Sequence, residues 1–221
     1  MTRRQAANPC AGGGERPATG RERYKRPFDL ALTALALVLA GPLWLALGGT
    51  IALAIRIEDG GPVLYRQARL GRDGRVFRML KFRTMVEGAE ERTGPVWAAW
   101  RDARSTAVGR VLRRYHLDEL PQLVNVLRGE MSLVGPRPER PALAARIDRT
   151  VPGFESRLRV RPGIAGLAQW RGGYPVRAQH KLRYDNLYIA RMSPWLDLRL
   201  CAACVCRTLR PHGPDARRDD A

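Results

Sequence analysis

The chain has 221 residues, enough for one domain of ordinary size with a short appendage. Its 39 lysine and arginine residues against 21 acidic residues give a formal net charge of +18, and 45% of the residues are hydrophobic. The apolar content excludes a disordered basic tail. The charge indicates a polyanionic partner: nucleic acid, an anionic membrane surface or a phosphorylated substrate.

The N-terminal part predicts a tail followed by a membrane element. Residues 1–20 are rich in Gly, Pro, Ala and Arg, which is typical of a flexible basic tail. Residues 30–55 then form a run of 26 residues without a charge. A helix that spans a bilayer needs about 20 apolar residues, so this run predicts a membrane segment. Pro42 lies near its middle and predicts a break, because proline removes a backbone donor and clashes with the preceding turn.

The flanks of the apolar run favour a hairpin over a span. Lys25 and Arg26 precede the run, and Arg56 follows it. Basic residues favour the cytoplasmic side of a membrane, and here both ends are basic. A re-entrant element over residues 21–58 keeps both ends cytoplasmic. A single kinked span and a buried core helix remain alternatives.

The rest of the chain predicts one small catalytic domain over residues 59–210, with a flexible tail at 211–221. Residues 62–83 contain strand-forming side chains around a glycine-bounded turn at 71–74, which predicts a β-hairpin. Helical patterns follow at 108–112, 117–127, 139–149, 176–191 and 194–209. The expected fold class is therefore α/β and mostly helical: a re-entrant, broken membrane helix, and a cytoplasmic domain with a short hairpin and amphipathic interface helices.

The centre of the chain carries the chemistry. Asp118 and Glu119 are adjacent carboxylates at an expected helix start. The helix dipole stabilises acids at this position, so a structural role as a helix cap and a first-turn acid is the alternative. Their surroundings are strongly basic, which keeps a carboxylate ionised and suits an anionic substrate. An ionised aspartate can attack phosphorus, while arginine and a divalent cation offset the charge of a diphosphate.

An ordered set of motifs makes the sequence resemble the monotopic phosphoglycosyl transferases, a family of bacterial sugar transferases. The matching motifs cover roughly residues 23–205 and are KRPFDL at 25–30, GPVLYRQ at 61–67, KFRTM at 81–85, LDELPQ at 117–122, NVLRG at 125–129, MSLVGPRP at 131–138, RPGI at 161–164, GLAQW at 166–170 and WLDL at 195–198. One such motif is weak evidence, but the ordered set is highly specific.

The resemblance implies a reaction and the groups that perform it. A UDP-sugar gives its sugar-1-phosphate to polyprenyl (undecaprenyl) phosphate and UMP leaves, as the first membrane step of exopolysaccharide, O-antigen or other glycoconjugate assembly. Asp118 would be the nucleophile that carries a covalent phosphosugar. Glu119 would assist, either by orienting the nucleophile and the metal or by taking the proton of the lipid phosphate. Mg²⁺ is implied as the cofactor, with Asp118 its ligand. The implied location is the cytoplasmic face of the bacterial inner membrane, against anionic lipids, and nucleic acid is not an implied partner.

Four basic residues receive a substrate-binding role from the same resemblance. Lys81 and Arg83 would line the phosphate site, although a solvated basic strand is the alternative. Arg137, held between two prolines, would contact the diphosphate or the nucleotide, although a purely structural turn is the alternative. Arg104 matches a family stretch that usually reads Asp-Pro-Arg, in which Ala103 here replaces the proline. The sequence leaves the sugar and the oligomeric state open.

Other features have weaker readings. A membrane-anchored basic module that binds nucleic acid or anionic lipid without catalysis is the alternative function, although no nucleic-acid-binding motif is legible. Three cysteines near the C-terminus, Cys201, Cys204 and Cys206, are expected to be packing residues rather than metal ligands. The aromatic residues near the C-terminus fit the membrane interface and an ordinary core about equally well: Trp170, Tyr174, Tyr184, Tyr188 and Trp195.

Overall fold

The computed structural model describes residues 22–91, 94, 96, 102–172 and 177–209. The tails expected at 1–20 and 211–221 lie outside these residues, and so does Tyr174. The described chain is mostly helical, with two small two-stranded sheets and one long apolar helix near its start.

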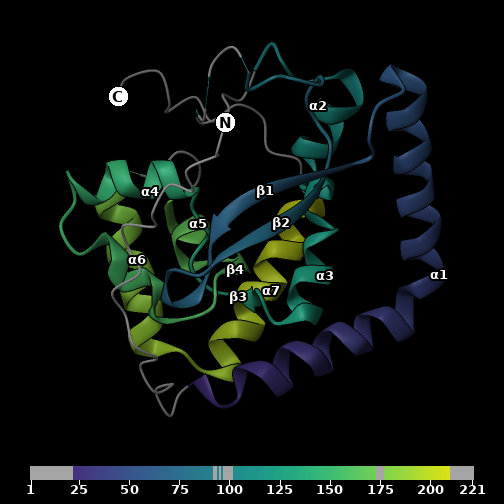
Figure 1. Cartoon of the computed structure of the whole chain (residues 1–221). Helices are drawn as coiled ribbons and strands as arrows, with labels where there is room; N and C mark the ends of the chain where they lie inside the picture. The colour runs from purple at the N-terminus through teal and green to yellow at the C-terminus, as the bar shows by residue number, and fades with distance from the viewer. Residues whose placement is uncertain (1–21, 92–93, 95, 97–101, 173–176, 210–221) are drawn as a thin grey trace.

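The apolar run forms a single bent helix, α1 (Lys25–Asp59). Its backbone leaves helical geometry at Ala40, where φ is −129° and ψ is 16°. This position lies two residues before Pro42, so the predicted break is confirmed. Figure 1 shows the two arms of α1 meeting in a sharp bend, one arm running beneath the domain and the other rising beside it.

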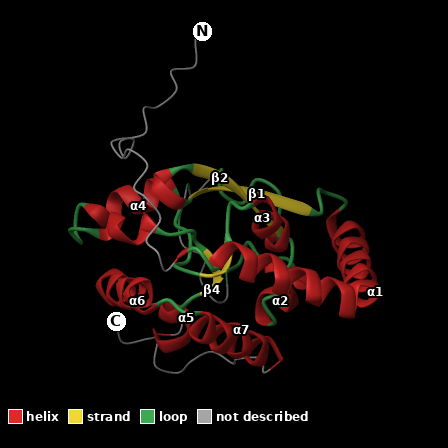
Figure 2. Ribbon diagram, turned by 90° about the horizontal axis from the view of Figure 1, so that it is seen from below, coloured by secondary structure: helices red, strands yellow, loops and turns green. Residues whose placement is uncertain are grey.

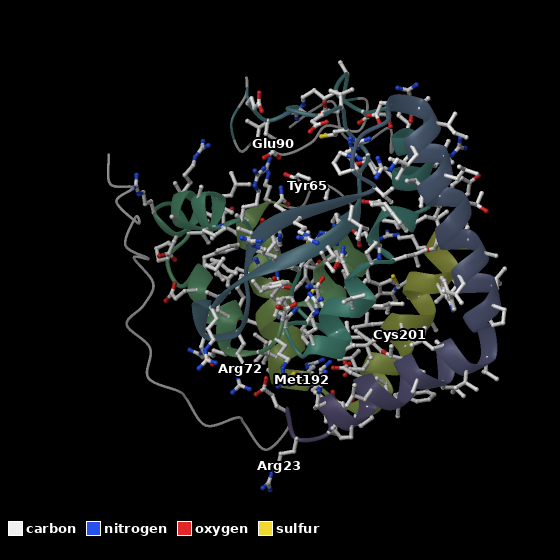
Figure 3. The ribbon with its side chains drawn as sticks, turned by 45° about the vertical axis from the view of Figure 1, so that its right-hand side comes forward. Arg23, Tyr65, Arg72, Glu90, Met192 and Cys201 are labelled. Carbon is white, nitrogen blue, oxygen red and sulfur yellow. The ribbon has the colours of Figure 1, made fainter. Side chains whose placement is uncertain are left out.

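Apolar side chains cover the outside of α1. Several are largely exposed around the bend, including Val38 at 79% and Leu45 at 79%. Only 6% of the most apolar 18-residue stretch is buried within the protein, and the helix is long and apolar enough to cross a membrane. In Figure 3, carbon side chains project from α1 away from the domain. The buried core helix considered from the sequence is therefore wrong.

Both ends of α1 are attached to the same domain. At the start, the ammonium group of Lys25 donates to the carbonyl of Val134 at 2.6 Å and pairs with Asp197 at 2.9 Å. Near the end, Ile51 and Ile55 are 6% and 3% exposed and belong to one apolar cluster with residues of the domain. The bend thus returns the second arm to the body from which the first arm departs.

The predicted β-hairpin is confirmed. Strands β1 (Leu64–Leu70) and β2 (Val76–Phe82) pair antiparallel, joined through a 3₁₀ turn, η2 (Arg72–Gly74). The register sets Tyr65 opposite Lys81. Because alternate residues of a strand share a face, Gln67 and Arg69 lie on the same face of the hairpin as this pair.

The helix expected at 117–127 is divided into two pieces. Helix α2 (Ala107–Arg114) is followed by a 3₁₀ turn, η3 (Leu117–Glu119), and then by α3 (Gln122–Arg128). Pro121 is the residue immediately before α3, and its ring removes a backbone donor at the junction. Gly129 ends α3 in the left-handed conformation, with φ of 80°.

The remaining elements build the body beneath the hairpin. The expected helices at 139–149, 176–191 and 194–209 correspond to α4 (Pro141–Asp148), α6 (Ala178–Arg191) and α7 (Pro194–Leu209). Elements not predicted are the parallel strands β3 (Ser132–Val134) and β4 (Gly163–Ala165), the 3₁₀ segment η4 (Phe154–Arg159) and helix α5 (Leu167–Gly172). Figure 2 shows the hairpin on one side and α5, α6 and α7 on the other, with β4 between them.

Burial differs among the aromatic residues near the C-terminus. Tyr188 is 1% exposed and packs in the main cluster with Val134 and Leu200. Trp195 and Trp170, by contrast, are 68% and 43% exposed. Tyr188 is therefore a core residue, whereas the two tryptophans lie at the surface.

Candidate active site

The two carboxylates of the motif lie together in the 3₁₀ turn η3. His116, just before it, has φ of 54°, a left-handed conformation that turns the chain between α2 and η3. Asp118 and Glu119 are 7% and 8% exposed. This turn presents both acids to the interior of the domain rather than to solvent.

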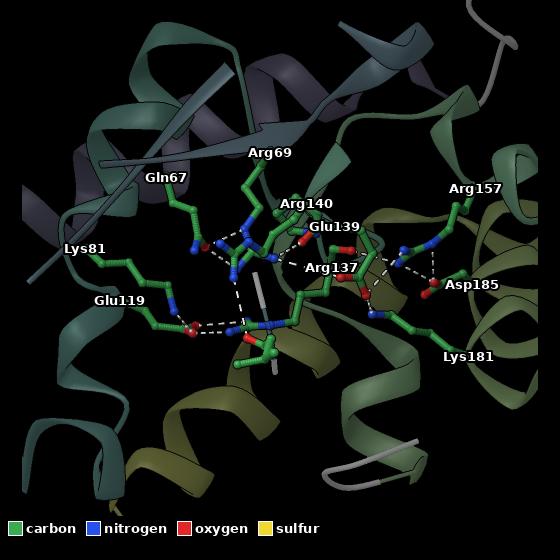
Figure 4. Close-up of polar contacts among 12 residues, drawn as sticks. Gln67, Arg69, Lys81, Glu119, Arg137, Glu139, Arg140, Arg157, Lys181 and Asp185 are labelled. Carbon is green, nitrogen blue, oxygen red and sulfur yellow. Dashed lines mark hydrogen bonds and ion pairs between the residues drawn. The ribbon is translucent and has the colours of Figure 1, made fainter. Parts of the chain in front are cut away.

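Two basic side chains converge on this pair from distant parts of the chain. From β2, Lys81 lies with its Nζ atom 2.9 Å from Oε1 of Glu119 and 3.4 Å from Oδ2 of Asp118. From the turn after β3, Arg137 donates from Nη1 to Oε2 of Glu119 at 3.2 Å, and from Nη2 to Oε1. Figure 4 shows Glu119 between these two cations. The structure therefore brings four of the predicted site residues together.

The two carboxylates have different electrostatic environments. Burial alone would raise the pKa of Glu119, but the charges and hydrogen bonds of Arg137 and Lys81 outweigh it and hold that pKa well below its usual value. Burial raises the pKa of Asp118, and the adjacent charge of Glu119 adds to this against the opposing charge of Lys81. Glu119 is thus held ionised by two cations, whereas within the described chain Asp118 pairs with Lys81 alone and at a longer distance.

The donor set fits a magnesium ion held jointly with a substrate. No group of three or more His, Cys, Asp or Glu side chains able to hold a metal occurs among the described residues. Mg²⁺ is commonly bound by one or two carboxylates together with phosphate oxygens and water. Within the described contacts, the Oδ1 atom of Asp118 accepts no hydrogen bond, so this carboxylate has an oxygen to offer.

Arg83 lies just past the end of β2 and contacts neither of the two carboxylates in the described structure. Its guanidinium pairs with Asp59 at the end of α1 and is 6% exposed. Within the described chain, its buried Nε and Nη1 atoms have no hydrogen-bond partner. Gly61 lies directly against this guanidinium, where any side chain would collide with it. Arg83 therefore has two N–H-bearing atoms without a partner among the described residues, in a closely packed position beside the end of α1.

Arg104 forms an ion pair on the loop between β2 and α2. Its Nε and Nη2 atoms donate to the two oxygens of Asp102 at 2.8 and 2.7 Å. This contact lowers the pKa of Asp102 to about 2. The ion pairs of Arg83 and Arg104 do not include Asp118 or Glu119, so the four predicted substrate-binding residues fall into two groups.

A group of charged residues behind Arg137 was not predicted from the sequence. It comprises Arg69 on β1, Glu139 and Arg140 after the turn, Arg157 on η4, and Asp185 and Lys181 on α6 (Figure 4). Arg69 could have been identified from the sequence, because it is one of several basic residues spaced along the hairpin. For the residues of η4 and α6 nothing in the spacing linked them to the motif, since only the packing of α6 against η4 brings them close.

Of the three cysteines near the C-terminus, two pack against the core, and His116 beside the acidic pair is partly buried. Burial lowers the pKa of His116, so its imidazole is neutral at pH 7. Cys201 and Cys204 are partly buried against the main core cluster, whereas Cys206 is exposed. Burial, with Asp197 nearby, raises the pKa of Cys201 to about 12, and this thiol is therefore protonated at neutral pH.

Comparison with known proteins assigns the family. The sequence profile described as "Bacterial sugar transferase" matches residues 20–211, which include the acidic pair and both of its cations. The chain belongs to the bacterial sugar transferase family. The family expected from the ordered motifs is therefore confirmed.

Individual relatives are about 40% identical to this sugar transferase over the aligned residues. A UDP-glucose:undecaprenyl-phosphate glucose-1-phosphate transferase of Caulobacter vibrioides is 42% identical over 198 residues, covering 87% of this chain and 72% of the relative. The exopolysaccharide production protein ExoY of Rhizobium meliloti is 39% identical over 214 residues, covering 88% and 91%.

Other relatives are considerably longer. A UDP-N-acetylgalactosamine-undecaprenyl-phosphate N-acetylgalactosaminephosphotransferase of Aeromonas hydrophila is 41% identical over 189 residues, and the match covers 84% of this chain but 43% of that protein. The chain thus spans less than half the length of some relatives that it matches.

Proposed function

We propose that this sugar transferase moves a sugar-1-phosphate from a UDP-sugar to polyprenyl phosphate and releases UMP. The observation that carries the proposal is the division of roles within the acidic pair, in which Glu119 is bound by Lys81 and Arg137 while Asp118 keeps an available oxygen. Several relatives are named as transferases that act on a UDP-sugar and undecaprenyl phosphate, which supports the same reaction class.

The proposed reaction has two displacements at one phosphorus atom. In the first, a carboxylate oxygen of Asp118 bonds to the sugar-side phosphorus of the UDP-sugar, and the bond from that phosphorus to the bridging oxygen breaks, so UMP leaves with the electron pair. In the second, an oxygen of the lipid phosphate attacks the same phosphorus and displaces Asp118. The product is a polyprenyl diphosphate sugar, and the carboxylate is restored.

The electrostatics favour an anchoring role for Glu119 over that of a base. A carboxylate whose pKa is held well below its usual value accepts protons poorly. Glu119 instead holds Arg137 and Lys81 beside Asp118, where their charges can stabilise the phosphoryl group during transfer. The lipid phosphate is already anionic at neutral pH and needs no strong base.

The remaining basic residues suit the other phosphates. Arg83 has buried donors that a phosphate oxygen can satisfy, and it lies beside the end of the membrane helix. Arg104 lies on the loop between β2 and α2 and does not contact the acidic pair in the described structure. Its proposed substrate-binding role rests on the family motif alone. Mg²⁺, held by Asp118, would offset the charge of the diphosphate.

The bent helix supports a re-entrant arrangement at the cytoplasmic face of the membrane. A straight span would carry one end of α1 across the bilayer, yet Lys25 near the start and Ile55 near the end both contact the same domain. The exposed apolar surface around Pro42 would enter the lipid, and the basic flanks would face anionic headgroups.

The test is UMP release from UDP-sugars by the full chain in membranes, with and without polyprenyl phosphate. Asp118→Asn is expected to abolish release and to remove a phosphosugar adduct detectable by mass spectrometry on the peptide that contains residue 118. Asp148→Asn, an exposed acid on α4, is the matched control and should retain activity. Undiminished release by Asp118→Asn would overturn the nucleophile assignment.

A further inference from the structure

The turn that carries Arg137 is held by its carbonyl groups. Prolines at 136 and 138 flank this arginine and leave the turn with few N–H donors of its own. The carbonyl of Pro136 accepts from the backbone of Gly163 at 3.0 Å, and that of Pro138 accepts from Arg69 at 2.8 Å. Between them, the carbonyl of Arg137 itself accepts from another part of the chain.

That donor is Arg157, on η4. Its Nη2 atom lies 2.7 Å from the carbonyl oxygen of Arg137. The same guanidinium contacts Asp185 of α6, with Nε and Nη2 at 2.9 and 2.7 Å from Oδ2, and it stacks over the ring of Phe154 at 4.8 Å. Arg157 and Asp185 are 3% and 1% exposed. Figure 4 shows this pair on the far side of Arg137 from Glu119.

Stability is a poor explanation for such a pair. Removing two charges from water is costly, and well-packed apolar residues of similar volume often stabilise a protein equally well or better. The pair instead fixes the orientation of the Arg157 guanidinium. The planar guanidinium can bond a carboxylate along one edge and still donate to a carbonyl, which the single ammonium group of a lysine does much less well.

We propose that Arg157, oriented by Asp185, is a positioning residue that fixes the backbone of Arg137 and so aims the Arg137 guanidinium at Glu119 and at the substrate phosphates. This inference rests on the proposed function for the identity of the substrate. The chain of contacts runs from α6 through η4 to the turn and then to the acidic pair. The two buried residues Arg157 and Asp185 act on the site through Arg137.

The consequence for catalysis follows from geometry. Arg137 acts by electrostatic stabilisation, which depends on donors that are already in place when charge develops. A displacement of about 1 Å in such a group can cost on the order of 100-fold in rate. Loss of the Arg157 contact is therefore expected to lower kcat far more than it raises KM.

The kinetic experiment uses Arg157→Lys and Asp185→Asn in the full chain, with Arg159→Lys as the matched control. Arg159 is an exposed arginine on the same 3₁₀ segment. Each of the first two variants is expected to lose roughly 10- to 100-fold in kcat for UMP release, with thermal unfolding monitored in parallel. In an Arg137→Ala background, Arg157→Lys should cost less than about twofold more, because its effect passes through Arg137.

An activity-independent measurement separates this inference from the proposed function. The guanidinium of Arg137 is followed by NMR of ¹⁵N-labelled arginine at fixed pH, with its Nε–H resonance assigned by Arg137→Lys. Arg157→Lys should shift and broaden this resonance as the contact with Glu119 loosens, whereas Arg159→Lys should not. A folded Arg157→Lys protein with an unchanged Arg137 resonance, or with losses that multiply fully with those of Arg137→Ala, would overturn the inference. A wild-type protein that releases no UMP would instead overturn the proposed function.

Discussion

At the scale of single residues, two adjacent acids acquire opposite properties from their neighbours. Glu119 touches both Lys81 and Arg137, whereas Asp118 touches Lys81 at a longer distance. The sequence identified this pair and its cations through motifs, but it could not say which acid each cation contacts. That distinction depends on the direction of each side chain, which the packing of β2 and the 135–138 turn decides.

The raised pKa of Asp118 predicts the pH dependence of the first displacement. The nucleophile must be ionised, so kcat/KM for UMP release should fall as the pH drops through this pKa, at a pH above the ordinary aspartate value of about 3.9. Lys81→Met removes a charge that lowers this pKa and should move the acid limb to higher pH. Arg128→Met, at an exposed position on α3, should leave the limb unchanged. A limb at or below the ordinary value would contradict the prediction.

A second ionisation makes a prediction about stability. Burial would raise the pKa of Glu139, but Lys181 and Arg157 hold it below its usual value. A lowered pKa in the folded state stabilises the protein above the unfolded-state value of about 4.3, and this contribution is lost as the pH falls. Glu139→Gln should therefore lower Tm at pH 7, and the difference from wild type should shrink below about pH 4. A difference that is constant with pH would argue against the ion pair.

At the scale of elements, the end of the membrane helix is joined to the start of α2. The carboxylate of Glu58 accepts from the backbone N–H groups of Ala107 and Val108, in addition to the Thr106 side chain that caps the same helix. A negative charge at this terminus also interacts favourably with the helix dipole. Helix α2 leads directly into the turn that carries the acidic pair, so this contact links α1 to the site.

Reversing the charge at this junction should destabilise the domain. Glu58→Lys removes the cap and places a cation at the N-terminus of α2, and we expect a loss of about 1 kcal/mol in the free energy of unfolding. Denaturant titration of the purified protein measures it. Glu87→Lys, at an exposed acid on the loop after β2, is the control for the change in net charge. Equal effects of the two variants would exclude a specific cap.

At the scale of the whole molecule, the bend in α1 returns the helix to the domain from which it departs. The first arm is bonded to the domain through Lys25, and the second packs against it through Ile51 and Ile55. The exposed apolar surface lies around the bend between these attachments. This distribution fits a helix that enters one side of the lipid and returns.

The arrangement predicts where engineered cysteines react. In a variant without the native cysteines, Arg23→Cys and Glu87→Cys, both at exposed positions, should be labelled by an impermeant maleimide from the same side of sealed vesicles. Leu45→Cys, near the bend, should be protected until detergent is added. Labelling of the first two positions from opposite sides would rule out the re-entrant arrangement.

Pro42 provides a complementary test. Pro42→Ala restores a backbone donor and removes the clash that bends the helix. A straighter α1 cannot keep both attachments to the domain, so the variant should lose thermal stability and UMP release together. Thr50→Ala, a helical substitution away from the bend, is the control, and an effect equal to that of Pro42→Ala would contradict this role of the proline.

The sequence by itself determined the local features of this protein. A charge-free run with a central proline predicted a long broken helix, and two glycines around a turn predicted the hairpin. The ordered motifs indicated the family. Each of these features depends on residues that are neighbours in the sequence. Tertiary structure alone decided the rest. The three-residue strands β3 and β4 are too short to show a period, and Arg157 and Asp185 reach Arg137 only because η4 and α6 pack together. Buried charges find their partners across the fold, and sequence spacing does not encode those directions.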